Sequence, residues 1–253
     1  MKIAIITGAS SGMGREFARQ LTAAEAFDEL WVIARRADRL EELKQELNLP
    51  VRVIALDLTK NLDQYEALLA AEQPQVSILI NSSGFGKFGR YDQIPLQDCM
   101  DMIDLNCKAL VAVTQLTLPY MTAGSRILQV DSLSAFQPVP YLNVYGATKA
   151  FVLSYSQALG AELKDRKIHV MAFCPGWVKT EFFEHAEKTS DNAVVYFNKW
   201  FTAEEAVRWG LKDLRKKKTV SVPSRTNQLQ VFGVKHLPTR LVMKIWLKQQ
   251  KKK

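Results

Sequence analysis

The chain has 253 residues, of which 47% are hydrophobic and 24% are charged, and this composition suits a folded protein with a substantial core. Three widely spaced cysteines favour reduced thiols over a disulfide framework, and three scattered histidines give no basis for a metal site. Although the net charge is +8, the sequence has no groove-reading motif, so we expect no nucleic-acid partner.

The first predicted element is a strand over residues 1–6, too short for the apolar core of a signal peptide or for a membrane helix of roughly 20 residues. We therefore expect a cytoplasmic protein. A Gly-rich turn follows, and then a helical pattern over residues 15–26. Such a strand, turn and helix N-terminus bind the pyrophosphate of a dinucleotide, because glycines admit the phosphates and helix N–H groups attract their charge. The alternative is a turn that merely reverses the chain. The candidates are Gly8, Ser10, Ser11, Gly12, Met13 and Gly14.

The second predicted strand, residues 29–34, ends beside Arg35 and Arg36. The adenosine ribose of a dinucleotide is recognised at this strand end, where an NAD enzyme has a carboxylate. A guanidinium instead suits the 2′-phosphate of NADP(H). We therefore predict NADP(H) as the cofactor, bound by Arg35 with Arg36 and Ser10 sharing the phosphate. The alternative for Arg36 is a solvated start of the next helix.

Amphipathic helices over residues 36–47 and 62–72 then alternate with aliphatic strands over residues 51–56 and 76–80. This alternation predicts an α/β fold with one doubly wound parallel sheet of about seven strands and helices on both faces. Ligands of such sheets bind at the carboxyl ends of the strands. The candidates at these ends are Asp57, Asn81 and Gly84.

A long helix predicted over residues 96–121 carries Asn106 among apolar neighbours. A buried amide there needs partners, so it is either a satisfied core residue or a functional one. The strand predicted over residues 126–130 then ends at Asp131 and Ser132, beside the expected nicotinamide.

Tyr145 and Lys149 are four residues apart in a helix predicted over residues 145–164, so both side chains leave the same face. A free tyrosine titrates near pH ~10, and a nearby ammonium favours the phenolate and lowers that pKa. Tyr145 is therefore a candidate general acid or base. Taken alone, the two residues also fit an exposed pair on a solvated helix face. The strand predicted over residues 168–173 follows and leads into Cys174-Pro175-Gly176-Trp177-Val178-Lys179-Thr180.

Over residues 1 to about 222 the chain resembles the short-chain dehydrogenase/reductase (SDR) family. The resemblance rests on motifs in the family's order and spacing: Thr7-Gly8-x-x-x-Gly12-x-Gly14, Asn81-x-x-Gly84, Asn106, Ser132, Tyr145-x-x-x-Lys149, and Pro175-Gly176 through Thr180. Two features depart from the family pattern. Ser82 and Ser83 replace the second Asn and the Ala of its Asn-Asn-Ala-Gly motif, and Asp131 stands where a small or apolar residue is commoner.

The resemblance implies a Rossmann fold with a catalytic set of Asn106, Ser132, Tyr145 and Lys149. Tyr145 would exchange a proton with the substrate oxygen, and Lys149 would lower the pKa of Tyr145 and hold the nicotinamide ribose. Ser132 would bind the substrate carbonyl, because donors must meet the alkoxide that hydride transfer creates. Asn106 would anchor a water relay to Lys149. The remaining cofactor contacts implied are Asp57 and Leu58 at the adenine, Asn81, Gly84, Pro175, Gly176, Val178, and Thr180 at the carboxamide.

The segment over about residues 181–200 is rich in aromatic side chains and is predicted to be a lid with an apolar inner face. A helix over residues 203–212 and a strand over residues 219–222 complete the predicted catalytic domain, residues 1–222. Residues 223–253 form a basic amphipathic extension. We favour packing of this extension on the fold or on a neighbouring subunit; contact with an anionic membrane surface is the alternative.

These patterns predict an NADP(H)-dependent oxidoreductase that interconverts a carbonyl and a secondary alcohol on an apolar small molecule. The alternative is a sensor or scaffold that binds NADP(H) without turnover, for which Asp131 is the hint. Within the SDR family, the chain loosely resembles the branch of hydroxysteroid dehydrogenases and ketoacyl reductases. The resemblance also implies a homodimer or homotetramer that associates through the helices at residues 96–121 and 145–164.

Overall fold

The central sheet contains seven parallel strands in the order β3-β2-β1-β4-β5-β6-β9, as predicted. The computed structural model describes residues 1–186 and 193–251. The order reverses beside β1, and this topological switch point is where open α/β sheets bind ligands. The strands are Lys2–Thr7 (β1), Glu29–Ala34 (β2), Val51–Ala55 (β3), Gln75–Asn81 (β4), Met121–Val130 (β5), His169–Phe173 (β6) and Val220–Ser221 (β9).

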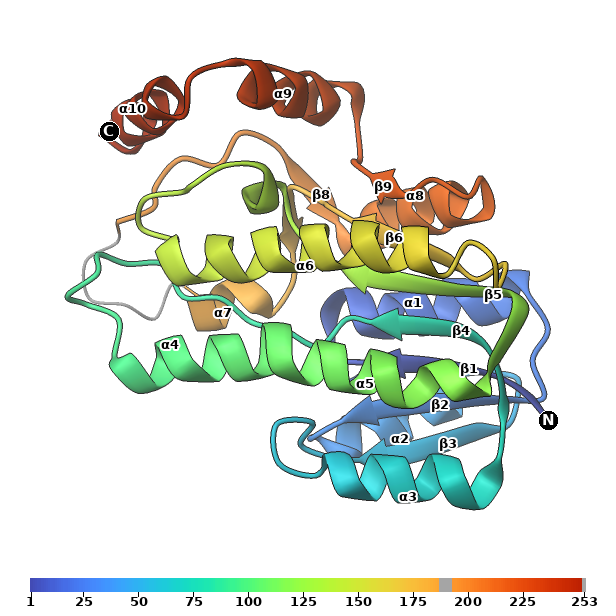
Figure 1. Ribbon diagram of the computed structural model, residues 1–253. Coiled ribbons are helices and arrows are strands. Elements are labelled where there is room, and N and C mark those ends of the chain that lie inside the picture. The colour runs from blue at the N-terminus through green and yellow to red at the C-terminus, as the bar shows by residue number, and fades with distance from the viewer. Residues whose placement is uncertain (187–192, 252–253) are drawn as a thin grey trace.

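Helices cover both faces of this sheet (Figure 1). Because side chains alternate along a strand, Ala4 and Ile6 of β1 enter one apolar core while Ile3 and Ile5 enter the other. The helices on the first face are Gly12–Ala24 (α1), Ala37–Glu46 (α2) and Ala203–Arg215 (α8). Those on the second face are Leu62–Glu72 (α3), Leu110–Thr117 (α5) and Asn143–Glu162 (α6).

The prediction of one long helix over residues 96–121 is wrong in two respects. It is interrupted by a π-helical turn, and it ends before Pro119, whose ring and missing N–H do not fit a helix interior. Met121 already pairs with Val76 in the sheet, so β5 is longer than predicted. The segments are Leu96–Ile103 (α4), the π-helical Asp104–Ala109 (η1), α5, and the short 3₁₀ turn Leu118–Tyr120 (η2).

A small second sheet, which the sequence did not predict, pairs Trp177–Lys179 (β7) with Trp200–Thr202 (β8). It joins the two ends of the predicted lid over about residues 181–200. The lid begins with the short helix Phe182–Ala186 (α7), and its residues 187–192 lie outside the described residues. A 3₁₀ turn, Leu133–Phe136 (η3), precedes α6.

Two helices, Arg225–His236 (α9) and Thr239–Gln250 (α10), follow β9, and we call this pair the C-terminal cap. Figure 1 shows both helices outside the α/β layers, with α10 toward the side at which the strand arrowheads point. In the part of the chain that the structure describes, no helix has the length and hydropathy needed to cross a bilayer.

Candidate active site

The Gly-rich turn forms a backbone cradle between β1 and α1. Gly8 has φ +68°, and a Cβ there would lie 2.8 Å from the Ser82 and Ser83 backbone. A Cβ on Gly14 would lie 2.1 Å from the Gly8 carbonyl oxygen, so only glycine lets the helix start this close to the strand. The helix begins at Gly12, three residues before the predicted start, and its first turn, Gly-Met-Gly-Arg, has no acidic side chain. This cradle fits a dinucleotide pyrophosphate.

At the end of β2, Arg36 rather than Arg35 is joined to the Gly-rich turn. Its guanidinium donates to the Ser10 hydroxyl, with Nη2 at 3.2 Å, and pairs with Glu181 at 2.9 Å. Arg35 is exposed and lies near enough to Asp57 for its charge to lower the pKa of that carboxyl. The two arginines therefore flank the position where an adenosine ribose is read.

The side chains at the ends of β3 and β4 are engaged with the protein itself. Asp57 Oδ1 accepts from the backbone N and the hydroxyl of Thr59, at 3.0 and 2.7 Å. Burial raises the pKa of Asp57, but these hydrogen bonds outweigh it and the net pKa is lowered. Leu58 is buried in the core. Asn81 Nδ2 donates to Thr114 and Gln129, both at 2.9 Å, so its amide ties β4 to α5 and β5.

Asn106 lies in the π-helical turn, a local widening that is frequent at functional sites. Its Nδ2 donates to the Phe85 carbonyl at 2.8 Å and to Thr148 Oγ1 at 3.1 Å, and its Oδ1 accepts from Phe85 N at 3.0 Å. It therefore holds the loop after β4 against α6. Gly84 in that loop is close to Lys149, because a Cβ there would lie 3.8 Å from Lys149 Nζ.

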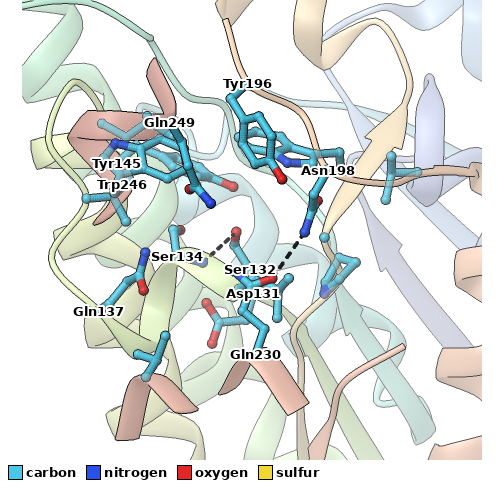
Figure 2. Close-up of a pocket in the computed structure, with 18 of the residues that line it drawn as sticks. Asp131, Ser132, Ser134, Gln137, Tyr145, Tyr196, Asn198, Gln230, Trp246 and Gln249 are labelled. Carbon is cyan, nitrogen blue, oxygen red and sulfur yellow. Dashed lines mark hydrogen bonds between the residues drawn. The ribbon is translucent and has the colours of Figure 1, made fainter. Parts of the chain in front are cut away.

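Ser132, Tyr145 and Lys149 come together at the carboxyl end of β5 and the first turns of α6. Lys149 is buried, and its Nζ donates to the Val130 carbonyl at 2.8 Å and lies 5.7 Å from the centre of the Tyr145 ring. Tyr145 is also buried and makes a side-chain hydrogen bond with Ser132. Ser132 Oγ accepts from Ser134 N at 3.2 Å (Figure 2). The structure thus places these two side chains close together, and both are buried rather than solvated.

The pKa of Tyr145 differs from the sequence expectation. Burial raises it, the hydrogen bond with Ser132 lowers it, and the negative charge of Asp131 raises it further, for a net rise. Desolvation of the phenolate thus prevails in the structure, and the prediction that the Lys149 charge lowers the pKa of Tyr145 stays a prediction. Burial also lowers the pKa of Lys149, and the Asp131 carboxylate opposes that shift.

Asp131 is the charged partner that sequence reasoning left without a role. Only 2% of it is exposed, and its Oδ2 accepts from Cys174 Sγ at 3.5 Å, while its Oδ1 has no partner among the described residues. Burial raises its pKa to about 7, against the opposing charge of Lys149 and hydrogen bonds from Cys174 and the Ser132 backbone. Above that pH a carboxylate therefore acts on both Lys149 and Tyr145.

Replacing Asp131 with asparagine is expected to shift the pH profile of alcohol oxidation to lower pH. Oxidation needs a deprotonated Tyr145, so its rate rises as pH passes the pKa of that phenol, and the Asp131 charge raises this pKa. We would measure kcat for a secondary alcohol across pH, with Asp104→Asn on η1 as the matched control. Identical profiles for Asp131→Asn and the native protein would contradict this coupling.

A cavity of about 430 Å³ opens above these groups. Its floor includes Asp131, Ser132 and Tyr145, and Figure 2 shows Tyr196, Asn198, Gln230 and Gln249 around the same space. Of the predicted cofactor residues, those lining it are Met13, Tyr145, Pro175, Gly176, Val178 and Thr180. Gly12 belongs to the same region, because a Cβ there would lie 3.2 Å from the Thr180 side chain.

Three aromatic side chains of the predicted lid, Phe182, Phe183 and Tyr196, line the cavity, and the lid aromatics pack on one another. Phe183 lies 4.5 Å from Trp200, and Trp177 lies 4.9 Å from Phe197, measured between ring centres. Phe182 packs on Tyr145 at 5.6 Å. Phe88 and Trp177 also line the cavity. Phe136 lies beneath Lys235 of α9, whose Nζ is 5.1 Å from its ring.

The C-terminal cap closes the cavity from above, and sequence reasoning missed this role. Trp246 Nε1 donates to the Pro140 carbonyl at 2.9 Å, which fixes α10 to the loop before α6. Gln250 Oε1 accepts from Val195 N and Tyr196 N, at 3.0 and 3.1 Å, which fixes α10 to the lid. Gln230 of α9 accepts from Asn198 at 3.1 Å (Figure 2). The helical spacing of Val242, Trp246 and Gln249 was the available signal.

Comparison with known proteins agrees with this geometry. A family model described as short chain dehydrogenase matches residues 2–191. An uncharacterised oxidoreductase of Staphylococcus epidermidis is 34% identical over 187 residues, covering 72% of this chain and 80% of that protein. A very-long-chain 3-oxoacyl-CoA reductase of Rattus norvegicus is 33% identical over 242 residues, covering 91% of this chain and 72% of that protein. The structure of a short-chain dehydrogenase from Sphingobium yanoikuyae in complex with NADPH has a TM-score of 0.77 and 26% sequence identity, and the match covers 98% of this chain and 94% of that one.

Proposed function

The chain belongs to the short-chain dehydrogenase/reductase family, and within it we propose an NADP(H)-dependent enzyme that interconverts a ketone and a secondary alcohol on an apolar molecule. The observation that carries this proposal is the buried group of Ser132, Tyr145 and Lys149, of which Ser132 and Tyr145 line a largely apolar cavity. Turnover of apolar ketones with NADPH tests it. The similarity to a 3-oxoacyl-CoA reductase supports a place near the ketoacyl reductase branch.

The side chains divide the chemistry between them. The nicotinamide, when bound, supplies or accepts the hydride. Ser132 and Tyr145 point their hydroxyl groups at one region of the cavity, so both hydrogen-bond the substrate oxygen there. Tyr145 gives its proton to that oxygen during reduction and takes it back during oxidation. Its raised pKa keeps the phenol protonated at neutral pH, which suits the acid role in reduction.

Lys149 and Asn106 keep this arrangement in place. The Lys149 ammonium, fixed on the Val130 carbonyl, stabilises negative charge that develops on the phenol. Asn106 holds α6 through its hydrogen bond to Thr148. We propose that Asn106 also anchors a water relay to Lys149. Asp57 and Leu58 would flank the adenine, and Thr180 would meet the carboxamide.

The cofactor preference rests on the basic end of β2. Arg36 and Ser10 are already hydrogen-bonded there, and Arg35 adds a second exposed cation. A 2′-phosphate would replace Glu181 as the partner of Arg36, whereas a free 2′-hydroxyl gains little from either guanidinium.

Removing these cations is therefore expected to weaken NADPH binding selectively. Loss of a charge-assisted hydrogen bond costs about 1.5–3 kcal/mol, which is roughly a tenfold to hundredfold change in affinity. The variant with Arg35→Ala and Arg36→Ala should bind NADPH no more tightly than NADH. The variant with Ala34→Asp and Arg35→Ala should bind NADH more tightly than NADPH. Dissociation constants from cofactor fluorescence measure this, with Arg39→Ala on α2 as the control. Equal native affinities for NADPH and NADH would refute the assignment.

We also propose a cytoplasmic homodimer or homotetramer that associates through α4, α5 and α6. The support is a group of exposed apolar side chains on α4 and α6: Leu96, Met100, Ile103 and Phe151.

A further inference from the structure

The outer face of the C-terminal cap combines exposed apolar side chains with positively charged side chains, and the cap has no negatively charged ones. Leu229 and Phe232 of α9 are 72% and 63% exposed. Leu241 and Ile245 of α10 are each 43% exposed. From residue 225 to 251 the chain has no Asp or Glu and six cations, Arg225, Lys235, Arg240, Lys244, Lys248 and Lys251.

The two kinds of side chain share helix faces. On α10, Leu241, Lys244, Ile245 and Lys248 follow the spacing that places residues on one side of a helix. The opposite side of α10 is committed to the fold through Val242 and Trp246. One side of α10 therefore packs on the fold, and the exposed side carries apolar side chains flanked by lysines. This pattern is typical of a helix that lies in a membrane interface.

The same surface is continuous with the mouth of the cavity. Leu229, Leu237 and Ile245 all line the cavity, and all three are also exposed. An apolar compound dissolved near the membrane surface would thus meet Leu229, Leu237 and Ile245 at the mouth of the cavity that Ser132 and Tyr145 line.

We propose that the C-terminal cap docks on an anionic lipid bilayer surface, with the cavity mouth facing the acyl layer. Charge selects this occupant over a second copy of the chain, because a symmetric contact would bring the exposed cations of one cap, such as Lys244 and Lys248, against those of another. Anionic lipid headgroups neutralise them instead, while Phe232 and Leu241 enter the interface.

Vesicle binding tests this docking without any need for turnover. We would measure flotation with vesicles of phosphatidylcholine alone and of phosphatidylcholine mixed with phosphatidylglycerol. The native protein is expected to bind the anionic vesicles and to be released by high salt, because exposed charges are then screened. Lys244→Gln with Lys248→Gln should lower partitioning roughly thirtyfold, since each surface cation contributes about a factor of five.

Two further variants separate the contributions. Phe232→Ser with Leu241→Ser removes exposed apolar groups that do not line the cavity, and should also weaken vesicle binding. Lys108→Gln with Lys212→Gln removes two charges from η1 and α8, and should bind like the native protein. Circular dichroism and NADPH affinity report folding of each variant.

Three results would overturn the proposal. The first is no binding of the native protein to anionic vesicles. The second is a loss of binding in the Lys108→Gln and Lys212→Gln variant that is as large as in the Lys244→Gln and Lys248→Gln variant. The third is a lower molar mass by light scattering when Phe232 and Leu241 are replaced, because a second copy would then cover this face.

Discussion

Tyr145→Phe is expected to lower kcat about 10²–10⁴-fold in either direction while leaving the affinity for NADPH nearly unchanged. The phenol faces the cavity beside Ser132, and phenylalanine keeps the ring that packs on Phe182. The change therefore removes the transferable proton and little else. Absorbance of NADPH gives the rate, and cofactor fluorescence gives the dissociation constant.

The matched control is Tyr155→Phe, about three turns further along α6. Tyr155 stacks on Phe151 with ring centres 6.0 Å apart, and its hydroxyl accepts from Gln115 at 3.3 Å, outside the cavity. Its rate should match that of the native protein. Full turnover in Tyr145→Phe would remove Tyr145 as the proton donor.

Lys149→Met is expected to damage turnover, cofactor binding and stability together. The substitution removes the positive charge that helps the buried Asp131 carboxyl to ionise, so an ionised Asp131 becomes more costly in the folded state. Because burial already raises the pKa of Asp131 to about 7, the unpaired carboxyl is protonated at low pH and costs least there. The loss of stability should therefore grow as pH rises toward and beyond 7.

A second substitution separates the structural role of Lys149 from its chemical role. Asp131→Asn removes the buried charge, so Lys149→Met in that background should recover stability in urea denaturation and lose its pH dependence. Turnover should stay low, because the ammonium beside Tyr145 is still missing. Recovered turnover in the double variant would mean that Lys149 serves only to neutralise Asp131.

The sequence predicted those parts of the site whose geometry is local. The Gly-rich turn and the Tyr145 to Lys149 spacing each depend on a few consecutive residues, and the aliphatic strands determine which residues end at one edge of the sheet. The structure accordingly brings Met13, Ser132 and Thr180 to one cavity from three separate strand ends.

Features that depend on packing could not be predicted in this way. The apolar spacing in α10 indicated a helix, but its position over the cavity depends on distant partners, Pro140 and Val195. The sign of the Tyr145 pKa shift depends on burial, which neighbours in sequence do not report. The assignment of Arg36 likewise changed because Ser10 and Glu181 meet it in space.

The most direct test of the account is NADPH consumption with a panel of apolar ketones, run with the native protein and with Tyr145→Phe. We expect the native protein to oxidise NADPH in the presence of at least one ketone, and Tyr145→Phe to bind NADPH without consuming it. A native protein that binds NADPH yet reduces no ketone or diketone would contradict an enzymatic role and would favour a sensor or scaffold.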